Sequence, residues 1–247
     1  MINLYTEKEI EIMAEGGKIL AKILKEITKN AKAGVTTKYL DKVVEDLIFR
    51  YGAKPSFKGY NGYPTTLCTS INEEIVHAIP SNRELKNGDL LTLDLGIRFK
   101  GLCTDSAITI GIDRIDKKLQ KLMDVTKKSL ELAIKQCKPG NRLGDIGCAI
   151  QAYVEKNGFN VIRDLVGHGV GKNVHEEPEI LNYGNKGEGM VLKPGMVLAI
   201  EPMIVIGNYE VERAKDGFAF LSKDHSISAH FEHTIAITKK GCRVLTK

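Results

Sequence analysis

Apolar residues recur at helical spacing in four segments of the 247-residue chain. The first segment follows Thr6, where the sequence TEKE is typical of a capping box that begins a helix, and its apolar positions continue to Ile27. Gly52 and Gly158 are placed to end the second and fourth helices. The remaining predicted helices span about residues 37–51, 116–137 and 142–157.

Strand patterns follow each pair of predicted helices. The clearest is LTLDLGIRFKGLCTDSAITIG at 91–111, where apolar residues alternate along two arms joined by a turn near 99–101. Gly, Pro and Asn residues predict loops near 60–64, and after residue 158 the chain is mostly strand and turn. The order helix, helix, strands therefore occurs twice.

The two halves of the sequence also resemble each other. KAGVTTKYLDKVVEDLIFRYG aligns with KPGNRLGDIGCAIQAYVEKNG 106 residues later, and KNGDLLTLDLG aligns with KPGMVLAIEPM 107 residues later. The second alignment superposes Asp94 on Glu201. We predict a single α+β domain over 1–247, with related halves of about 1–111 and 112–247 and with helices on one face of a mostly antiparallel sheet. A site between the halves would collect acids from both.

Composition is ordinary for a soluble globular protein, with 43% hydrophobic and 27% charged residues. The sequence has no run of about 18 apolar residues, so no membrane segment is expected, and its N-terminus does not resemble a signal peptide. Five scattered cysteines without a CxxC pair favour a reducing, cytoplasmic setting. The net charge of +5 is weak evidence for a contact with RNA-rich machinery, and no specific nucleic-acid partner is expected.

Asp94 and Asp105 stand in the arms of the apolar hairpin, although aspartate is a poor strand former and costly to bury alone. A turn with an even number of residues would put both carboxylates on one face, opposed or diagonal. Carboxylates that close repel each other, and a cation between them would remove the repulsion. Alternatively, one aspartate caps a turn while the other faces water; the pattern alone leaves both interpretations open.

Glu201 and Glu232 occupy two further apolar strand patterns, MVLAIEPMIVIG and AHFEHTIAIT. Alternation in the second pattern puts Glu232 on the face opposite Phe231. Ion pairs with lysine or arginine are the alternative explanation for each of the four acids. Basic residues are almost absent from these strand cores, however, and Arg98 is the nearest to the first pair. The acids therefore need another partner.

VGHGVGKNVHEEPEI supplies His168 and His175. Glycines on both sides of His168 allow its backbone to approach a neighbouring group closely. A lone histidine is more often a buried polar residue than a ligand, but four carboxylates without partners favour the ligand role. Such donors suit divalent Mn, Fe, Co or Zn, and their number fits two ions that share carboxylates. CTSIN and LCTDS lack a nucleophile elbow, and no GxGxxG or Walker pattern occurs.

The sequence resembles the type I methionine aminopeptidases, metallopeptidases with the pita-bread fold, along essentially the whole chain. The motifs that carry the resemblance are NGYPTTLCTSINEEIVHAIP, LDLGIRFKGLCTDSA, GHGVGKNVHEEP, LAIEPM and FEHT. The resemblance implies a pseudo-twofold pita-bread fold and removal of the initiator methionine from nascent proteins whose second residue is small. It further implies two divalent ions (Co, Mn, Fe(II), Zn or Ni), a metal-bound hydroxide as nucleophile, and a peptide or nascent-chain N-terminus as partner. We expect a monomer without a membrane partner, and a transient ribosome contact is compatible with the charge.

The resemblance also assigns roles to individual residues. Asp105 and Glu232 would bridge the ions, and Glu201 would also shuttle a proton. His77 and His175 would be catalytic and would contact substrate; without the resemblance, His77 reads as a surface loop residue. The implied metal ligands are Asp94, Asp105, His168, Glu201 and Glu232. The implied methionine pocket is Tyr60, Tyr63, Cys68, Val174 and Phe218.

Two alternatives are weighed against this interpretation. An aminopeptidase P or a prolidase would share the five ligands, but those enzymes carry a large additional N-terminal domain for which this chain has no room. A non-catalytic pita-bread protein that binds peptides or ribosomes would have lost one or more ligands, and here all five positions carry the expected residue types.

Overall fold

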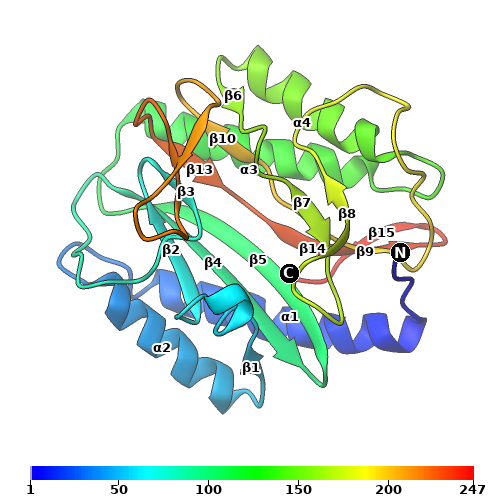
Figure 1. The fold of residues 1–247 in the computed structure, drawn as a ribbon, viewed down its shortest axis with the longest axis horizontal. Coiled ribbons are helices and arrows are strands. Elements are labelled where there is room, and N and C mark those ends of the chain that lie inside the picture. Colours follow the sequence, from blue (N-terminus) through cyan, green and yellow to red (C-terminus); the bar gives the residue numbers. More distant parts are fainter. Residues whose placement is uncertain (1) are drawn as a thin grey trace.

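The computed structural model describes residues 2–247, and the four predicted helices are confirmed in this range (Figure 1). The predicted capping box is present: the Thr6 side chain accepts a hydrogen bond from the Glu9 backbone, and the Glu9 carboxylate accepts one from the Thr6 backbone. The helices are α1 (Glu7–Thr28), α2 (Thr37–Arg50), α3 (Lys117–Gln136) and α4 (Leu143–Lys156).

The strands within residues 2–247 form four antiparallel groups. β4 pairs with β5 and with β1 and β2, while the other groups have the orders β13-β10-β6, β11-β12-β3 and β15-β14-β9-β7-β8. A short 3-10 helix at Tyr60–Gly62 lies in the predicted loop region. The strands are β1 (Lys54–Pro55), β2 (Leu67–Ile71), β3 (Glu74–Val76), β4 (Leu90–Phe99), β5 (Leu102–Gly111), β6 (Asn160–Val161), β7 (Gly167–Gly169), β8 (Glu176–Ile180), β9 (Val197–Ile200), β10 (Met203–Val205), β11 (Val211–Arg213), β12 (Phe220–Ser222), β13 (Ser228–His230), β14 (His233–Thr238) and β15 (Gly241–Val244).

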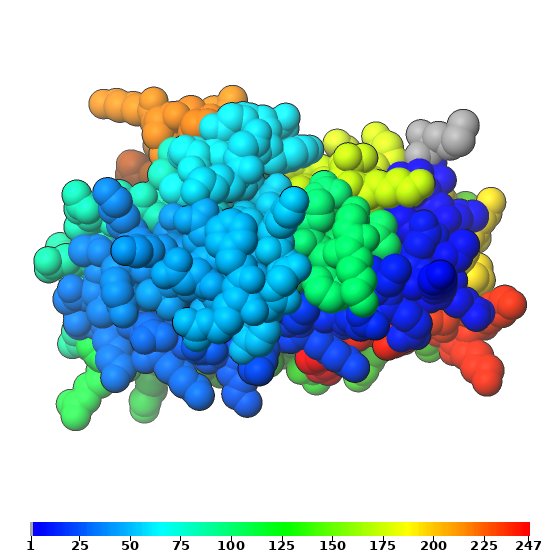
Figure 2. Space-filling view, turned by 90° about the horizontal axis from the view of Figure 1, so that it is seen from below, coloured from blue at the N-terminus to red at the C-terminus, as the bar shows by residue number. Residues whose placement is uncertain are grey.

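Helix α1 lies against β4 and β5, and helix α2 lies against β1 and β2 on the same side; both helices belong to the outer surface seen in Figure 2. Leu91, Leu93 and Leu95 of β4 are buried in the core that these helices share with the ribbon. Alternation along the strand therefore turns Thr92 and Asp94 to the opposite face. Helices α3 and α4 pack on strands of the second half, α3 on β10 and β13 and α4 on β6. The helix, helix, strands order thus occurs twice, as predicted.

The β4–β5 hairpin confirms the expectation of an even-numbered turn. Phe99 pairs with Leu102 across the two-residue turn Lys100–Gly101, whose φ angles of 48° and 89° are both positive. In this register Asp94 faces Ala107, and Asp105 faces residue 96. The two aspartates are therefore diagonal neighbours on the same face, the face turned away from α1 and α2.

The prediction that Glu201 and Glu232 lie within strands is wrong. β9 ends at Ile200 one residue before Glu201, and β13 ends at His230 two residues before Glu232. The chain changes sheets at both places, since β9 and β14 belong to the five-stranded group and β10 and β13 to a three-stranded one. The Glu232 N–H donates to the Ala107 carbonyl of β5 instead (2.9 Å). These breaks place both carboxylates where the sheets meet.

No helix within residues 2–247 combines the length and the apolar character that a membrane crossing requires.

Candidate active site

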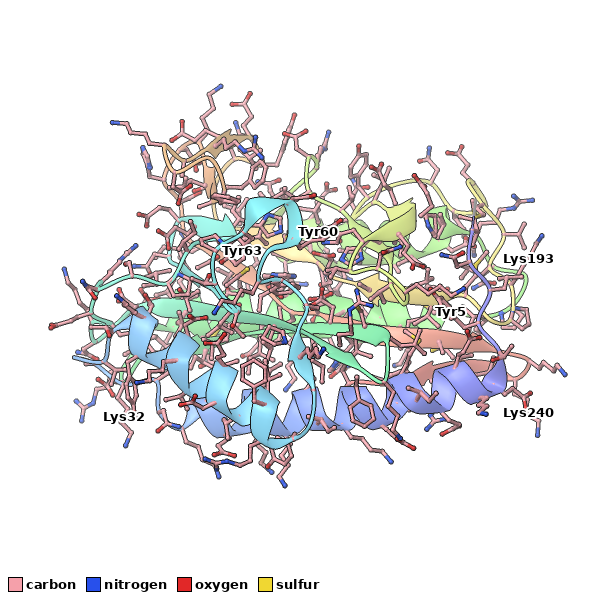
Figure 3. All side chains as sticks on the ribbon, turned by 60° about the horizontal axis from the view of Figure 1, so that its bottom comes forward. Tyr5, Lys32, Tyr60, Tyr63, Lys193 and Lys240 are labelled. Carbon is pink, nitrogen blue, oxygen red and sulfur yellow. The ribbon has the colours of Figure 1, made fainter. Side chains whose placement is uncertain are left out.

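A cleft of about 830 Å³ opens on the face of the β4–β5 ribbon opposite α1 and α2. Tyr60 and Tyr63 lie on this side of the ribbon in Figure 3. Val174 does not line the cleft; it is buried in the apolar cluster that also contains Tyr63 and Cys68. The other residues assigned from the sequence all line it: Tyr60, Tyr63, Cys68, His77, Asp94, Asp105, His168, His175, Glu201, Phe218 and Glu232.

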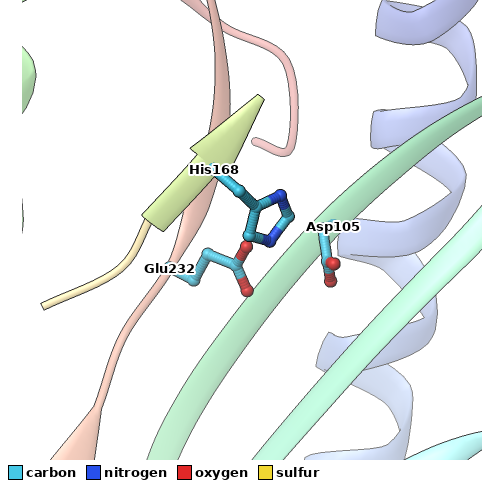
Figure 4. Close-up of side chains that lie close together, drawn as sticks. All are labelled: Asp105, His168 and Glu232. Atoms are coloured by element: carbon cyan, nitrogen blue, oxygen red, sulfur yellow. The ribbon is translucent and has the colours of Figure 1, made fainter. Parts of the chain in front are cut away.

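Three of these side chains, each from a different element, converge most closely. Asp105 from β5, His168 from β7 and Glu232 from the break before β14 each offer an atom within 4.8 Å of the others' (Figure 4). Within residues 2–247, none of the four acids forms an ion pair with a lysine or arginine. Arg98 donates to the carbonyl oxygens of Gly101 and Lys172 (3.0 and 2.9 Å) instead. The acids thus remain without a basic partner.

Burial raises the pKa of all four carboxyl groups. The pKa of Asp105 rises to about 7, and those of Asp94, Glu201 and Glu232 rise well above their usual values, first through burial and then through the neighbouring acids. One carboxylate oxygen on each of Asp94, Asp105 and Glu232 is buried without a hydrogen-bond partner in the described chain. Unpaired, buried oxygen donors that repel one another fit divalent cations.

His168 is held at the centre of this group by the glycines beside it. A Cβ atom at Gly167 would lie 2.5 Å from the Ala199 carbonyl oxygen, and one at Gly169 would lie 2.3 Å from that of Glu177, so only glycine lets β7 fit between β8 and β9. The His168 Nδ1 atom lies 2.9 Å from the Gly169 carbonyl. Burial lowers the pKa of His168 to about 3, which keeps the ring neutral, the form that binds metals.

His77 and His175 bring two further imidazoles to the cleft. The His175 ring contacts the rings of His168 and Tyr60 edge-on, with centroid distances of 4.2 and 5.2 Å. His77 has a φ of 61°, a left-handed conformation that costs energy for a residue other than glycine and that is found preferentially at functional sites. Burial lowers the pKa of His77 to about 4 and also lowers that of His175. Both rings are therefore neutral near pH 7.

An apolar pocket adjoins the acids. Tyr63 and Phe218 meet edge-on at 5.6 Å, and Cys68 on β2 pairs directly with Asp94 on β4. The Tyr63 hydroxyl lies 3.2 and 3.0 Å from the carbonyl oxygens of Leu67 and Ala78, which fixes its ring against the pocket. Burial raises the pKa of Cys68 and keeps its thiol protonated. The pocket therefore offers aromatic and sulfur surface beside the carboxylates.

His230 is a site residue that the sequence reasoning missed. Its side chain is 1% exposed, and its Nε2 atom lies 3.5 Å from Oε2 of Glu201. Burial lowers its pKa to about 3. Its position two residues before Glu232 in SAHFEHT could have drawn attention to it. The apolar side chains of Phe57, Met203 and Phe220 also line the cleft and were not foreseen.

Comparisons with known proteins agree with this geometry. A model of metallopeptidase family M24 matches residues 11–239. Methionine aminopeptidase 1 of Bacillus subtilis is 47% identical over 247 residues, covering 100% of both chains. The crystal structure of methionine aminopeptidase from Thermotoga maritima is 46% identical, covers 100% of both chains and superposes with a TM-score of 0.98.

A prolidase of Pyrococcus horikoshii is more distant, with 25% identity and a TM-score of 0.78. It matches 100% of this chain but only 64% of its own. The predicted α+β pita-bread fold is therefore confirmed, because both groups of solved structures share it with this chain. The chain belongs to metallopeptidase family M24, among its methionine aminopeptidases.

Proposed function

We propose that this enzyme removes the initiator methionine from nascent proteins whose second residue is small, by hydrolysis assisted by two divalent ions. One observation carries the proposal. Four buried carboxylates and one neutral imidazole, contributed by both halves of the chain, meet in one cleft beside an apolar pocket, without a lysine or arginine partner in the described residues.

The proposed ligands are the five side chains assigned from the sequence. Asp105 and Glu232 would bridge the ions, Asp94 would bind one, and His168 with Glu201 would bind the other. The spacing of Asp105, His168 and Glu232 supports this, because their donor atoms lie within 4.8 Å of one another. When bound, such ions acidify a water molecule and polarise a carbonyl group.

The chain's own side chains would move the proton and hold the peptide. Glu201 would accept the proton of the attacking water and pass it to the leaving amine, since burial raises its pKa and so strengthens it as a base. His175, next to His168, would hydrogen-bond the scissile amide or its oxyanion. His77 would contact the backbone of the second residue. The substrate's free amine would face the carboxylates, which limits cleavage to chain ends.

The methionine side chain would enter the apolar pocket. Tyr60, Tyr63, Cys68 and Phe218 line the cleft there, and Val174 packs into the same apolar cluster. Aromatic rings attract a thioether sulfur, so this lining suits methionine. Crowding around the scissile bond would restrict the second residue to small side chains.

Hydrolysis of short peptides tests the proposal. The metal-loaded enzyme should release methionine from Met-Ala-Ser, should cleave Met-Leu-Ser much more slowly, and should leave a Leu-Pro dipeptide intact. Cleavage of Leu-Pro with Met-Ala-Ser untouched would instead indicate a prolidase. Alanine variants of Asp105 and of Glu232 are the controls, and turnover that survives either substitution would indicate that the protein only binds peptides.

The setting of the reaction is also part of the proposal. We propose a cytoplasmic monomer with at most a transient ribosome contact. All five cysteines lie in the described residues and are free thiols, which suits a reducing compartment. Among the exposed large apolar residues of the described chain, only Tyr39 and Phe49 share a helix or strand, and they stand ten residues apart on α2.

A further inference from the structure

His230 is a buried histidine to which the proposed mechanism gives no role. It ends β13, opposite Met203 of β10, and its side chain is 1% exposed. Its backbone is fixed by Thr109 of β5, whose hydroxyl lies 2.8 Å from the His230 nitrogen and 2.7 Å from its carbonyl oxygen. The ring is therefore carried on a backbone that cannot shift independently of the β4–β5 ribbon.

The His230 ring lies against a carboxylate that already faces another imidazole. Nε2 of His168 lies 3.3 Å from Oε1 of Glu201, and Nε2 of His230 lies 3.5 Å from Oε2 of the same group. Each oxygen of Glu201 thus faces one ring. Neither ring nitrogen of His230 forms a hydrogen bond within residues 2–247, so Nε2 and Oε2 of Glu201 are in close contact at 3.5 Å without being hydrogen-bonded. Leaving both nitrogens of a buried ring unpaired is unfavourable, and Oε2 of Glu201 is an acceptor that lies close to Nε2.

We propose that His230 is a positioning residue, whose Nε2–H group donates to Oε2 of Glu201 and thereby directs Oε1 toward His168 and the metal site. The inference rests on the proposed function, because it assumes that Glu201 is a metal ligand. Carboxylates that bind metals are themselves held by hydrogen bonds from residues around them. His230 is the only imidazole in the described chain, apart from His168, that is paired with Glu201.

Metal binding to two variants of the full chain tests the proposal. His230→Leu removes the donor, whereas His230→Gln keeps an N–H donor in a side chain of similar reach. We expect the leucine variant to bind Mn²⁺ roughly 10–100-fold more weakly by calorimetric titration, the range typical of lost partners of metal ligands. The glutamine variant should keep most of the wild-type affinity. Equal affinities for the leucine variant and wild type, or equal losses in both variants, would overturn the proposal.

A measurement on the unaltered protein covers the case in which the leucine variant does not fold. Nitrogen-15 NMR of labelled histidine should show His230 as the neutral tautomer with its proton on Nε2. A proton on Nδ1 would contradict the proposed hydrogen bond. Wild-type protein that binds no Mn²⁺ would refute the proposed function itself, and the two failures are therefore distinguishable.

Discussion

At the scale of single residues, the defining feature is a set of acids whose burial is unfavourable unless cations are present. Asp105 is 3% exposed and Glu232 2% exposed, and each has a carboxylate oxygen without a hydrogen-bond partner in the described chain. Burial favours the protonated form of both groups, and the charges of the neighbouring acids add to this effect at Glu232. Such residues should matter more for metal binding than for the stability of the metal-free fold.

Asp105→Asn should separate these two quantities. Its affinity for Mn²⁺ should fall by more than about 10–100-fold, which is the loss typical when a hydrogen-bond partner of a metal ligand is replaced. Its free energy of unfolding without metal should stay within about 2 kcal/mol of wild type, because relief of repulsion offsets the poorly bonded amide. Calorimetric titration and chemical denaturation measure the two effects. Asp46→Asn, which removes an exposed charge on α2, is the matched control and should change neither.

Sequence reasoning located the acids but not all of their surroundings. Side-chain alternation along a strand is a local property, so the sequence was sufficient to predict that an even-numbered turn puts Asp94 and Asp105 on one face. Glu232 was assigned to a continuous strand, since the apolar pattern of AHFEHTIAIT does not reveal where a chain passes from one sheet to another. The contact between His230 and Glu201 is a tertiary one across this passage, and no local pattern specifies it.

At the scale of elements, the site depends on the contact between β5 and β14, which come from different halves of the chain. Side chains rather than a continuous ladder join them. The Thr234 hydroxyl accepts a hydrogen bond from the Asp105 N–H (2.8 Å) and donates one to the Asp105 carbonyl oxygen (2.7 Å). Ser106 of β5 similarly donates to the Glu232 carbonyl oxygen (2.7 Å). These bonds fix the backbones of both proposed bridging acids.

Thr234→Val should therefore weaken both the fold and the site. Valine has the same shape but leaves the N–H and the carbonyl of Asp105 without partners, at a cost of about 2–5 kcal/mol in unfolding free energy. Mn²⁺ affinity should fall as well, because Asp105 is no longer fixed. Thr234→Ser keeps the hydroxyl and should retain most of both quantities. A valine variant indistinguishable from the serine variant would show that the hydroxyl has no such role.

At the scale of the whole molecule, the fold brings the four buried acids together with the imidazoles of His168 and His230, and their effects on stability have opposite signs. The pKa of Asp105 is raised to about 7, so its contribution to stability is lost as pH rises through that value. The pKa values of His168 and His230 are lowered to about 3, so their contribution is lost as pH falls below about 6.5, where the unfolded chain takes up protons. Above pH 6.5 the acids alone should determine the slope.

Thermal unfolding of the full chain should show this slope directly. With a chelator present, the midpoint should fall as pH rises from about 6.5 to 8, because the buried acids ionise without partners. With Mn²⁺ bound, it should stay constant or rise over the same range, since metal ligation favours deprotonated carboxylates. Parallel pH profiles for the two forms would mean that the acids are not at the metal site.

The central claim is that five side chains from both halves of the chain hold two divalent ions. Anomalous diffraction at the cobalt edge, from crystals grown with Co²⁺, tests it most directly. The account predicts two peaks about 3.5–4 Å apart, enclosed by Asp94, Asp105, His168, Glu201 and Glu232. One peak or none within this set of side chains, with the acids neutralised by other groups, would contradict it.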